Sequence, residues 1–237
     1  GLADKQLDVF LGSWMPATRK KREAVKGSIE FLQTNMEGCI YTMGVPSYVW
    51  EAGVKSFNDL NEHADKFDKK MYVGPTGWDS SINMSKAIKN DTYNLGDWEA
   101  VNSSQSALIA HVKKAMKNKE WVVFVAWKPH WMNHILDIKY LKEPEGKIWE
   151  NPVSHVDTLL RKGLDEDYPE VYKFLEQFKV DTEAGDKWIY EIGKKNRDGS
   201  EVAKEWIKNN TQIVKKWLKG VKAADGRDGF TVLKESL

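Results

Sequence analysis

Four aromatic side chains of this chain stand where they could bind a ligand. Trp14, Tyr41, Trp78 and Trp127 each lie beside a short apolar run and close to glycine or proline. A ring face offers apolar area together with a negative quadrupole, so it can hold a cation, and sugars also stack on indole rings. The four rings therefore suggest binding chemistry rather than proton transfer.

Polar groups accompany these rings in two places. His130 follows Pro129, and a histidine at a strand end can donate a hydrogen bond to a carboxylate or can tie its own turn together. The main-chain N–H groups of residues 77–80, which start at Gly77 and open a predicted helix, form a second candidate anion site. Asp79 and Ser80 could instead cap that helix, which is the commoner role.

Short strands are predicted beside each of these positions. Apolar runs at 9–11, 71–73 and 122–125, and a further one next to Tyr41, are typical of buried strands. Helical patterns alternate with them, which indicates an α/β fold with largely parallel sheets. Because ligands of such sheets bind beyond the carboxyl ends of the strands, we expect the rings to stand at those ends.

Two helices are predicted between these strands. One begins just after Trp78 and places Ile82 and Ile88 on its inner side. The other begins at Ser103 or Ser104, because serine is a good N-cap, and its apolar residues recur at helical spacing.

The second half of the chain is mainly helical by pattern. Pro169 stands in the first turn of a helix whose apolar stripe continues to residue 178. Trp206 and Trp217 lie on the apolar sides of later helices, and we interpret both, together with Trp188, as core residues. The other tryptophans are interpreted as structural, rim or packing residues: Trp50, Trp98, Trp121, Trp131 and Trp149.

The composition bounds the class of protein. The chain has 237 residues, of which 41% are hydrophobic and 30% charged, enough for one large domain or two small lobes. Its net charge of +1 gives no reason to expect nucleic acid or an anionic membrane as a partner. No apolar run approaches the roughly 20 residues needed to span a bilayer, and we expect no signal peptide within these residues.

Metal and catalytic motifs are not evident in the sequence. Cys39 is the single cysteine, which excludes an internal disulfide and a cysteine-rich metal site. His130 and His134 have a zinc spacing for a helix, but Pro129 weakens that helix and no third ligand is evident. We expect neither cofactor nor metal. A carbohydrate-active enzyme with stacking tryptophans is an alternative that lacks a second strand-end carboxylate beside Asp79, and a protein-interaction domain is another.

Four motifs together resemble one family. The substrate-binding proteins of glycine betaine, proline betaine and choline ABC importers have segments similar to "DVFLGSWMPA", "YTMGVPSYVW", "AWKPHWMN" and "EVAKEWIKNNTQIVKKWLKGV". The resemblance implies the type II periplasmic-binding-protein fold, in which two α/β lobes joined by a hinge close on the ligand. Lobe one would be residues 1–38 plus 141–237 and lobe two residues 39–140.

The chain departs from this family at its start. Family members normally begin with another strand–helix–strand unit before the segment that corresponds to "DVFLGSWMP". We therefore expect the first lobe to be incomplete at its N-terminus.

The resemblance implies a cage of rings around a methylated cation. Trp14 would contribute from lobe one, and Tyr41 and Trp127 from lobe two. A quaternary ammonium has no N–H donor, so ring faces suit it. One desolvated ring is worth about 2 kcal/mol, so three or four would supply roughly 6–8 kcal/mol, near the affinity of a micromolar complex. Trp78 departs from the family's small or amide residue and is a fourth wall, a filler that shrinks the pocket, or a rim residue.

The implied function is transport. We expect an extracytoplasmic binding protein, not an enzyme, that captures a quaternary ammonium osmolyte and delivers it to the permease and ATPase subunits of an ABC importer. His130 and the N–H groups from Gly77 onward favour glycine betaine, whereas Asp79 could hold the hydroxyl of choline. Carnitine, proline betaine and trimethylamine N-oxide stay open. The protein would be free in a periplasm or held by a lipid anchor at the outer face of the membrane.

Overall fold

The computed structural model describes residues 1–149 and 153–237, which fold into two units. Unit 1 consists of Gly1–Cys39 and Ser154–Leu237, and unit 2 of Ile40–Val153. The first crossing between the units lies within strand β2 (Ile29–Pro46), one residue from the expected crossover at 38–39.

The second crossing differs from the expected lobe boundary. We expected lobe one to resume at residue 141, whereas unit 1 resumes at Ser154. Leu141 and Trp149 are buried in the core of unit 2, and this packing assigns the segment around them to that unit. Glu143 holds this segment in place, because its carboxylate accepts three backbone N–H groups between residues 147 and 149.

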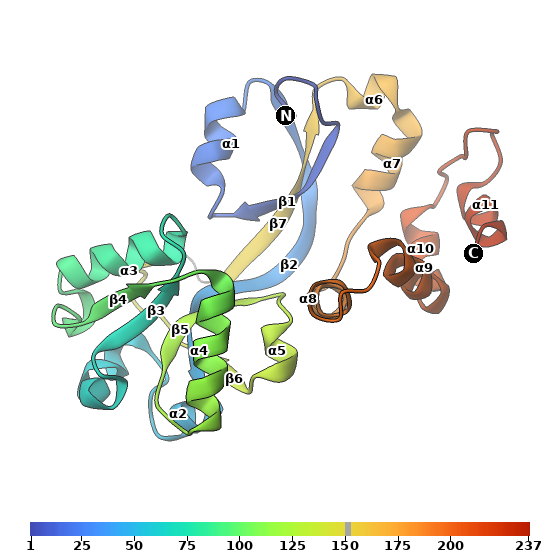
Figure 1. The fold of residues 1–237 in the computed structure, drawn as a ribbon. Coiled ribbons are helices and arrows are strands. Elements are labelled where there is room, and N and C mark those ends of the chain that lie inside the picture. Colours follow the sequence, from blue (N-terminus) through green and yellow to red (C-terminus); the bar gives the residue numbers. More distant parts are fainter. Residues whose placement is uncertain (150–152) are drawn as a thin grey trace. The chain divides into compact units, whose positions relative to one another are not determined.

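A mixed sheet forms the centre of unit 2. Its strands follow the order β2–β5–β3–β4, and β6 (Ile138–Tyr140) pairs with β2 (Figure 1). The second half of β2 runs antiparallel to β5 (Val123–Lys128) and to β6, while β3 (Lys70–Gly74) runs parallel to β4 (Glu99–Asn102) and to β5. The α/β class is therefore confirmed, but the expectation of largely parallel sheets is wrong because β2 pairs antiparallel with both neighbours in this unit.

Two helices of unit 2 begin where the sequence predicts. Ser104 is the N-cap of α4, and its Oγ accepts the Ala107 N–H at 3.2 Å. Helix α3 begins directly after Trp78. The helices of this unit are α2 (Ser47–Glu51), α3 (Asp79–Lys89), α4 (Gln105–Lys117) and α5 (Met132–Ile135), with short 3-10 turns at Phe57–Asp59, Asn61–Phe67 and Thr92–Asn94.

The inner face of α3 differs from the prediction. Ile82 is 55% exposed, whereas Ser80 and Ser81 are buried. Their hydroxyl groups make this burial possible, because Ser80 Oγ donates to the Val73 carbonyl at 2.7 Å and Ser81 Oγ accepts from Asn102 at 2.6 Å. Hydrogen bonds to the end of β3 and to β4, rather than apolar contact alone, therefore set the face that α3 presents to the sheet.

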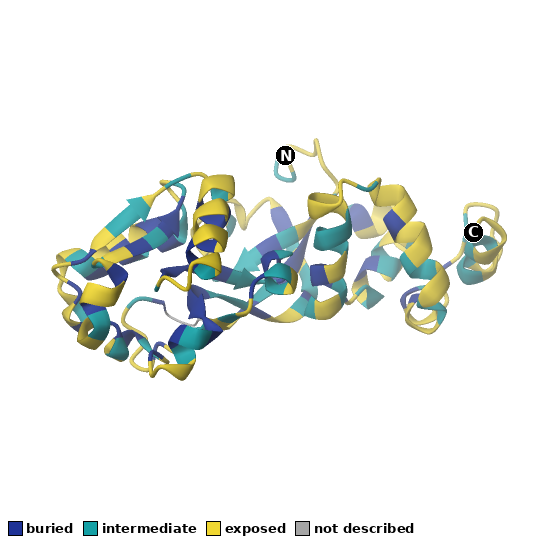
Figure 2. Cartoon of the chain, turned by 60° about the horizontal axis from the view of Figure 1, so that its bottom comes forward, coloured by how far each residue is buried: buried dark blue, intermediate teal, exposed yellow. Residues whose placement is uncertain are grey.

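One hydrophobic core fills unit 2. Its centre is β5, where every residue from Val122 to Ala126 is buried, and β3 and α4 pack beside it. Along the helices buried and exposed residues alternate, as the colours of Figure 2 show. The predicted packing role of Trp98 is consistent with its burial in this core.

Unit 1 is built on a three-stranded sheet. Strand β1 (Val9–Met15) pairs antiparallel with β7 (Val153–Arg161), which lies beside the first half of β2 (Figure 1). Helix α1 (Arg19–Val25) is tied to this sheet by an ion pair of 2.8 Å between Arg22 and the buried carboxylate of Asp157.

The C-terminal part of unit 1 is helical, as predicted. Pro169 is the first residue of α7. Trp217 is buried, and Trp188 and Trp206 are partly buried against the same cluster, which agrees with their interpretation as core residues. The helices are α6 (Leu164–Asp167), α7 (Pro169–Gln177), α8 (Thr182–Ile189), a π-helical turn (Tyr190–Lys194), α9 (Gly199–Asn209), α10 (Thr211–Trp217) and α11 (Gly229–Glu235).

Candidate ligand-binding site

Two of the predicted cage rings lie side by side in unit 2. Tyr41 on β2 stands directly opposite Trp127 on β5 in the antiparallel ladder. Opposite residues of such a ladder point to the same face, and the two ring centroids are 6.4 Å apart with planes inclined by 45°. Tyr41 is not at a strand end as expected, because β2 continues through it for five more residues to Pro46.

Trp78 joins this pair from the residue before α3. Its ring stands edge-on to Trp127, with centroids 5.4 Å apart and planes at 79°. Gly74 allows this position: a Cβ atom there would lie 3.0 Å from Cε3 of Trp78, and the φ of Gly74 is +79°. The end of β3 thus supports the indole, so that Tyr41, Trp78 and Trp127 form one aromatic wall.

The hydroxyl of Tyr41 is hydrogen-bonded within unit 2. It donates to Ser80 Oγ at 2.9 Å, and the Ser80 N–H lies 3.4 Å from the same phenolic oxygen. Burial raises the pKa of Tyr41 above its ordinary value, and the negative charge of Asp79 acts in the same direction. Tyr41 is therefore neutral at physiological pH, and its hydroxyl is engaged with Ser80.

His130 is packed beside Trp127 and has partners on both ring nitrogens. Its centroid lies 4.5 Å from that of Trp127, and only 5% of the residue is exposed. Nδ1 accepts the Met132 N–H at 3.2 Å, which puts the proton of the neutral ring on Nε2. The side-chain amide nitrogen of Gln105 lies 3.1 Å from Nε2, and this amide accepts the Nε2–H only with its oxygen turned toward the ring. This geometry favours the structural alternative over carboxylate binding.

Burial also sets the charge of His130. Removal of the ring from water lowers its pKa from 6.5 to about 4. The ring is therefore uncharged at neutral pH, and it adds no positive charge beside the aromatic wall.

The start of α3 offers fewer free donors than predicted. The Trp78 N–H donates to the Pro75 carbonyl, and the Ser80 N–H faces Tyr41. Within residues 1–149 and 153–237, no hydrogen bond is found for the N–H groups of Gly77 and Asp79, so these two are the donors left at this helix start. The capping alternative is wrong, because the N-cap is Trp78 and no side chain caps it.

Trp14 belongs to the other unit. It lies in β1 opposite Val156 of β7 and is partly buried, and its carbonyl accepts the Thr18 N–H at 2.7 Å. Its convergence with Tyr41 and Trp127 stays a prediction.

Three supporting residues were missed by the sequence interpretation. Ser80 and Gln105 hold Tyr41 and His130, and Gly74 makes room for Trp78. Only Gly74 had a visible signal, since a glycine between a strand and a tryptophan marks a close approach of the backbone. The serine and the amide act over 39 and 25 residues of sequence separation.

Neither a metal-ligand cluster nor a membrane-spanning helix is found among the described residues. In the described part of the chain, no three histidine, cysteine, aspartate or glutamate side chains are grouped so that they could hold a metal ion. Of the helices in the same part, none has both the length and the apolar character needed to cross a membrane.

A protein-family model matches most of the chain. The model describes the substrate binding domain of the ABC-type glycine betaine transport system, and it matches residues 1–209. The chain belongs to this family. The family consists of transporter substrate-binding proteins and is not a family of enzymes.

Curated relatives support membership of the glycine betaine binding family. The glycine betaine/carnitine transport binding protein GbuC of Listeria monocytogenes is 37% identical over 155 residues, which are 64% of this chain and 51% of GbuC. An uncharacterized protein, ORF1, of Chromohalobacter salexigens is 42% identical over 83 residues, 34% of this chain and 54% of that protein. The chain thus spans about half the length of these curated relatives.

Solved structures establish the fold of this family member. A choline binding protein of an ABC transporter, in complex with choline, has a TM-score of 0.83 at 30% identity, covering 99% of this chain and 82% of that one. Lactococcal OpuAC with glycine betaine has a TM-score of 0.77 at 31% identity, covering 92% and 82%. The fold is the two-lobed α/β fold of type II periplasmic binding proteins.

Proposed function

We propose that this protein binds a quaternary ammonium osmolyte, with glycine betaine as the first candidate, against the aromatic wall of Tyr41, Trp78 and Trp127. One observation supports this most directly: Tyr41 and Trp127 share one face of adjacent strands, and Trp78 stands edge-on beside them. Ring faces attract a methylated cation through both their quadrupole and their apolar area. The protein binds and releases its ligand without chemical change.

The wall has few polar groups to offer the cation end of a ligand. The Tyr41 hydroxyl is bonded to Ser80, and His130 is neutral and bonded on both nitrogens. The site therefore favours a group that needs no hydrogen bonds, and a trimethylammonium is such a group. Trp14 of unit 1 is proposed as a further ring against the same cation.

The carboxylate of glycine betaine needs donors. The N–H groups of Gly77 and Asp79 at the start of α3 are the candidate donors in unit 2, because no hydrogen-bond acceptor is found for either of them among the described residues.

Choline is a second candidate, and the position of Asp79 favours it. The negative charge of Asp79 acts on the Tyr41 hydroxyl, so this carboxylate lies near the aromatic wall. A carboxylate there would attract a ligand with one net positive charge and would repel the carboxylate of glycine betaine. A larger loss of choline than of glycine betaine affinity in Asp79→Asn would assign the ligand.

The ligand would be passed to a membrane permease and its ATPase subunits. Such delivery requires the binding protein to act on the outer side of the cytoplasmic membrane, either free or lipid-anchored. Membership of the glycine betaine transport family supports this placement.

Isothermal titration calorimetry with glycine betaine, choline, carnitine, proline betaine and trimethylamine N-oxide tests the function. Trp127→Leu keeps apolar bulk but removes the quadrupole, a loss of about 2 kcal/mol, so affinity should fall about thirty-fold. Trp127→Phe should retain more of the ligand affinity than Trp127→Leu, because a phenyl ring keeps a quadrupole. Trp121→Leu, which changes a ring packed on Phe67 in the same unit, is the matched control and should bind normally. If none of the five compounds binds, the proposal is wrong.

A further inference from the structure

The turn that follows β5 carries Trp127 and His130 of the candidate site. Trp127 is the last residue but one of β5, and Pro129 stands directly before His130. Proline has no backbone N–H, so this turn has one hydrogen-bond donor fewer with which to hold its shape. Side chains that bond the carbonyl groups of the turn therefore influence where the Trp127 ring lies.

Asn133 of α5 bonds two carbonyl groups of this turn. Its side-chain amide nitrogen donates to the carbonyl of Trp127 at 3.1 Å and to the carbonyl of His130 at 2.9 Å. An amide NH2 group has two hydrogens, so it can serve both carbonyls at once. One side chain thus bridges the two ends of the segment from Trp127 to His130.

Tyr140 orients the amide of Asn133. The Tyr140 hydroxyl donates to Asn133 Oδ1 at 2.6 Å, on the other side of the amide from its nitrogen. Tyr140 is half-buried and lies in β6, opposite Gly44 of β2. Strand β2, which carries Tyr41, therefore also supports the side chain that bonds the turn after Trp127.

These contacts fix the direction of the Asn133 amide. In the reversed orientation, its oxygen would face two carbonyl oxygens, and the Tyr140 hydroxyl would have no oxygen to which it could donate. One orientation alone satisfies all three partners. A side chain of the same size that lacks the amide nitrogen therefore cannot replace asparagine here.

We propose that Asn133, oriented by Tyr140, is a positioning residue that holds the Trp127 ring in the aromatic wall for ligand binding. The Trp127 ring has neighbours in Trp78 and His130, at centroid distances of 5.4 and 4.5 Å, so a shift of the turn would disturb both contacts. Asn133 acts through Trp127 and needs no contact with the ligand. Its effect on affinity rests on the proposed function, whereas its effect on the ring does not.

Calorimetry with glycine betaine and with choline measures the effect on affinity. Asn133→Ala removes both donors and should weaken binding about ten-fold. Asn133→Asp should also weaken binding about ten-fold, because a carboxylate oxygen then faces the two carbonyls, although its charge alone would strengthen the binding of a cation. Asn118→Ala, which removes an exposed amide that donates to Glu120 in the same unit, is the control and should change affinity less than two-fold.

A double-mutant cycle tests whether Tyr140 acts through Asn133. Tyr140→Phe should weaken binding about three-fold. The double variant of Asn133→Ala and Tyr140→Phe should bind no more weakly than Asn133→Ala alone, because the hydroxyl then has no amide to orient. Additive losses would contradict the proposal, since they would show that the two side chains do not form one support.

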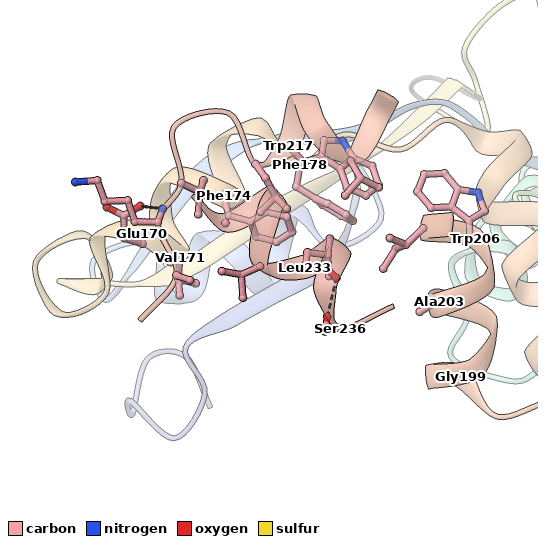
Figure 3. Close-up of a pocket in the computed structure, with 18 of the residues that line it drawn as sticks. Glu170, Val171, Phe174, Phe178, Gly199, Ala203, Trp206, Trp217, Leu233 and Ser236 are labelled. Carbon is pink, nitrogen blue, oxygen red and sulfur yellow. Dashed lines mark hydrogen bonds between the residues drawn. The ribbon is translucent and has the colours of Figure 1, made fainter. Parts of the chain in front are cut away.

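Fluorine NMR of the protein labelled with 5-fluorotryptophan observes the ring directly and needs no ligand. The resonance that is missing from Trp127→Phe identifies Trp127, and it should shift or broaden in Asn133→Ala. The Trp217 resonance, identified in the same way, should stay unchanged. Trp217 is a suitable reference because it lies in unit 1, in a ring cluster with Phe178 and Trp206 that lines an apolar cavity (Figure 3).

The spectrum separates this proposal from the proposed function. If neither compound binds, the proposed function fails, while a shifted Trp127 resonance still shows that Asn133 holds the ring. Should Asn133→Ala not fold, Tyr140→Phe, which leaves the asparagine in place, should give the same change of resonance with a smaller amplitude.

Two further results would overturn the proposal. One is an Asn133→Ala variant that loses stability in urea but keeps the wild-type Trp127 resonance or the wild-type ligand affinity, which would make the role of Asn133 purely structural. The other is tighter ligand binding by Asn133→Asp than by the wild type, which would show that charge, and not the position of the ring, governs affinity.

Discussion

The stability of the protein should fall in mild acid because of His130. Its folded-state pKa is about 4 and its unfolded value about 6.5, so below pH 6.5 the unfolded chain binds a proton that the folded chain excludes. The stabilisation that comes from keeping His130 neutral is fully present above pH 6.5, and it is lost as the pH falls from 6.5 toward 4. The folded and unfolded pKa values of His130 differ by about 2.5 units, which is roughly 3 kcal/mol of unfolding free energy at about 1.4 kcal/mol per unit. About 2 kcal/mol of this free energy is lost by pH 5.

Urea unfolding at pH 7.5 and pH 5 measures this loss. His130→Gln should be less stable at pH 7.5 but should lose about 2 kcal/mol less than the wild type between the two pH values. His134→Gln, an exposed histidine four residues away, should keep the wild-type pH dependence. The reasoning is refuted if His130→Gln loses as much as the wild type, or if an NMR titration of the His130 ring gives a pKa near 6.5.

Four further substitutions test the supports of the site and fold. Gly74→Ala should destabilise the protein by about 1–3 kcal/mol because its φ is +79° and its Cβ would meet Trp78, and calorimetry should show weaker ligand binding. Tyr41→Phe should cost about 1 kcal/mol in urea unfolding but leave ligand affinity within two-fold, since the ring remains. Glu143→Gln should cost about 2–3 kcal/mol, because a carboxylate that accepts three backbone N–H groups becomes an amide with one acceptor oxygen. Arg161→Lys should lower the melting temperature, because the guanidinium contacts Asp8 through Nε at 2.6 Å and Asp167 through Nη2 at 2.7 Å, and a single ammonium nitrogen does not reproduce this two-point geometry.

Local features of the fold were predictable from the sequence. The helix starts after Trp78 and at Ser104, and Pro169 at the start of α7, depend on residues within one turn of the boundary. The strand at 122–125 and the strand at 71–73 depend on short apolar runs, and both lie in or overlap the strands found. These signals come from residues that are neighbours in the sequence, so they can be recognised from the sequence alone.

Features that depend on distant residues were not predictable. The directions of the strands depend on which strands pair, and β2 pairs with β5 across 80 to 88 residues of sequence. Ser80 is buried because Tyr41 and Val73 bond it, so hydrophobic periodicity placed Ile82 inward by mistake. The second unit boundary likewise follows from the burial of Trp149, which has no local signature.

The candidate site also combines features that the sequence predicted with features that it did not. The resemblance selected Tyr41 and Trp127, and the β2–β5 ladder places them opposite each other on one face. It did not indicate that His130 would have both nitrogens engaged, because Gln105 lies on a separate helix. The resemblance thus predicted that Tyr41 and Trp127 lie together, while the protonation and availability of the polar groups required the fold.

Tryptophan content alone would not have separated the two aromatic groups of this protein. The wall in unit 2 and the ring cluster of unit 1 both consist of neighbouring rings, with centroids 5.4 and 6.4 Å apart in the wall and 5.3 Å apart for Trp206 and Trp217. They differ in the elements that carry them: Tyr41 and Trp127 stand opposite each other in a strand ladder, whereas Trp206 and Trp217 lie on helices α9 and α10 and pack against a core cluster. Opposite residues of an antiparallel ladder point to one face of the sheet, so a ladder can line up ring faces for a ligand. The element on which an aromatic residue lies, and not its type alone, therefore separates a candidate binding ring from a packing ring.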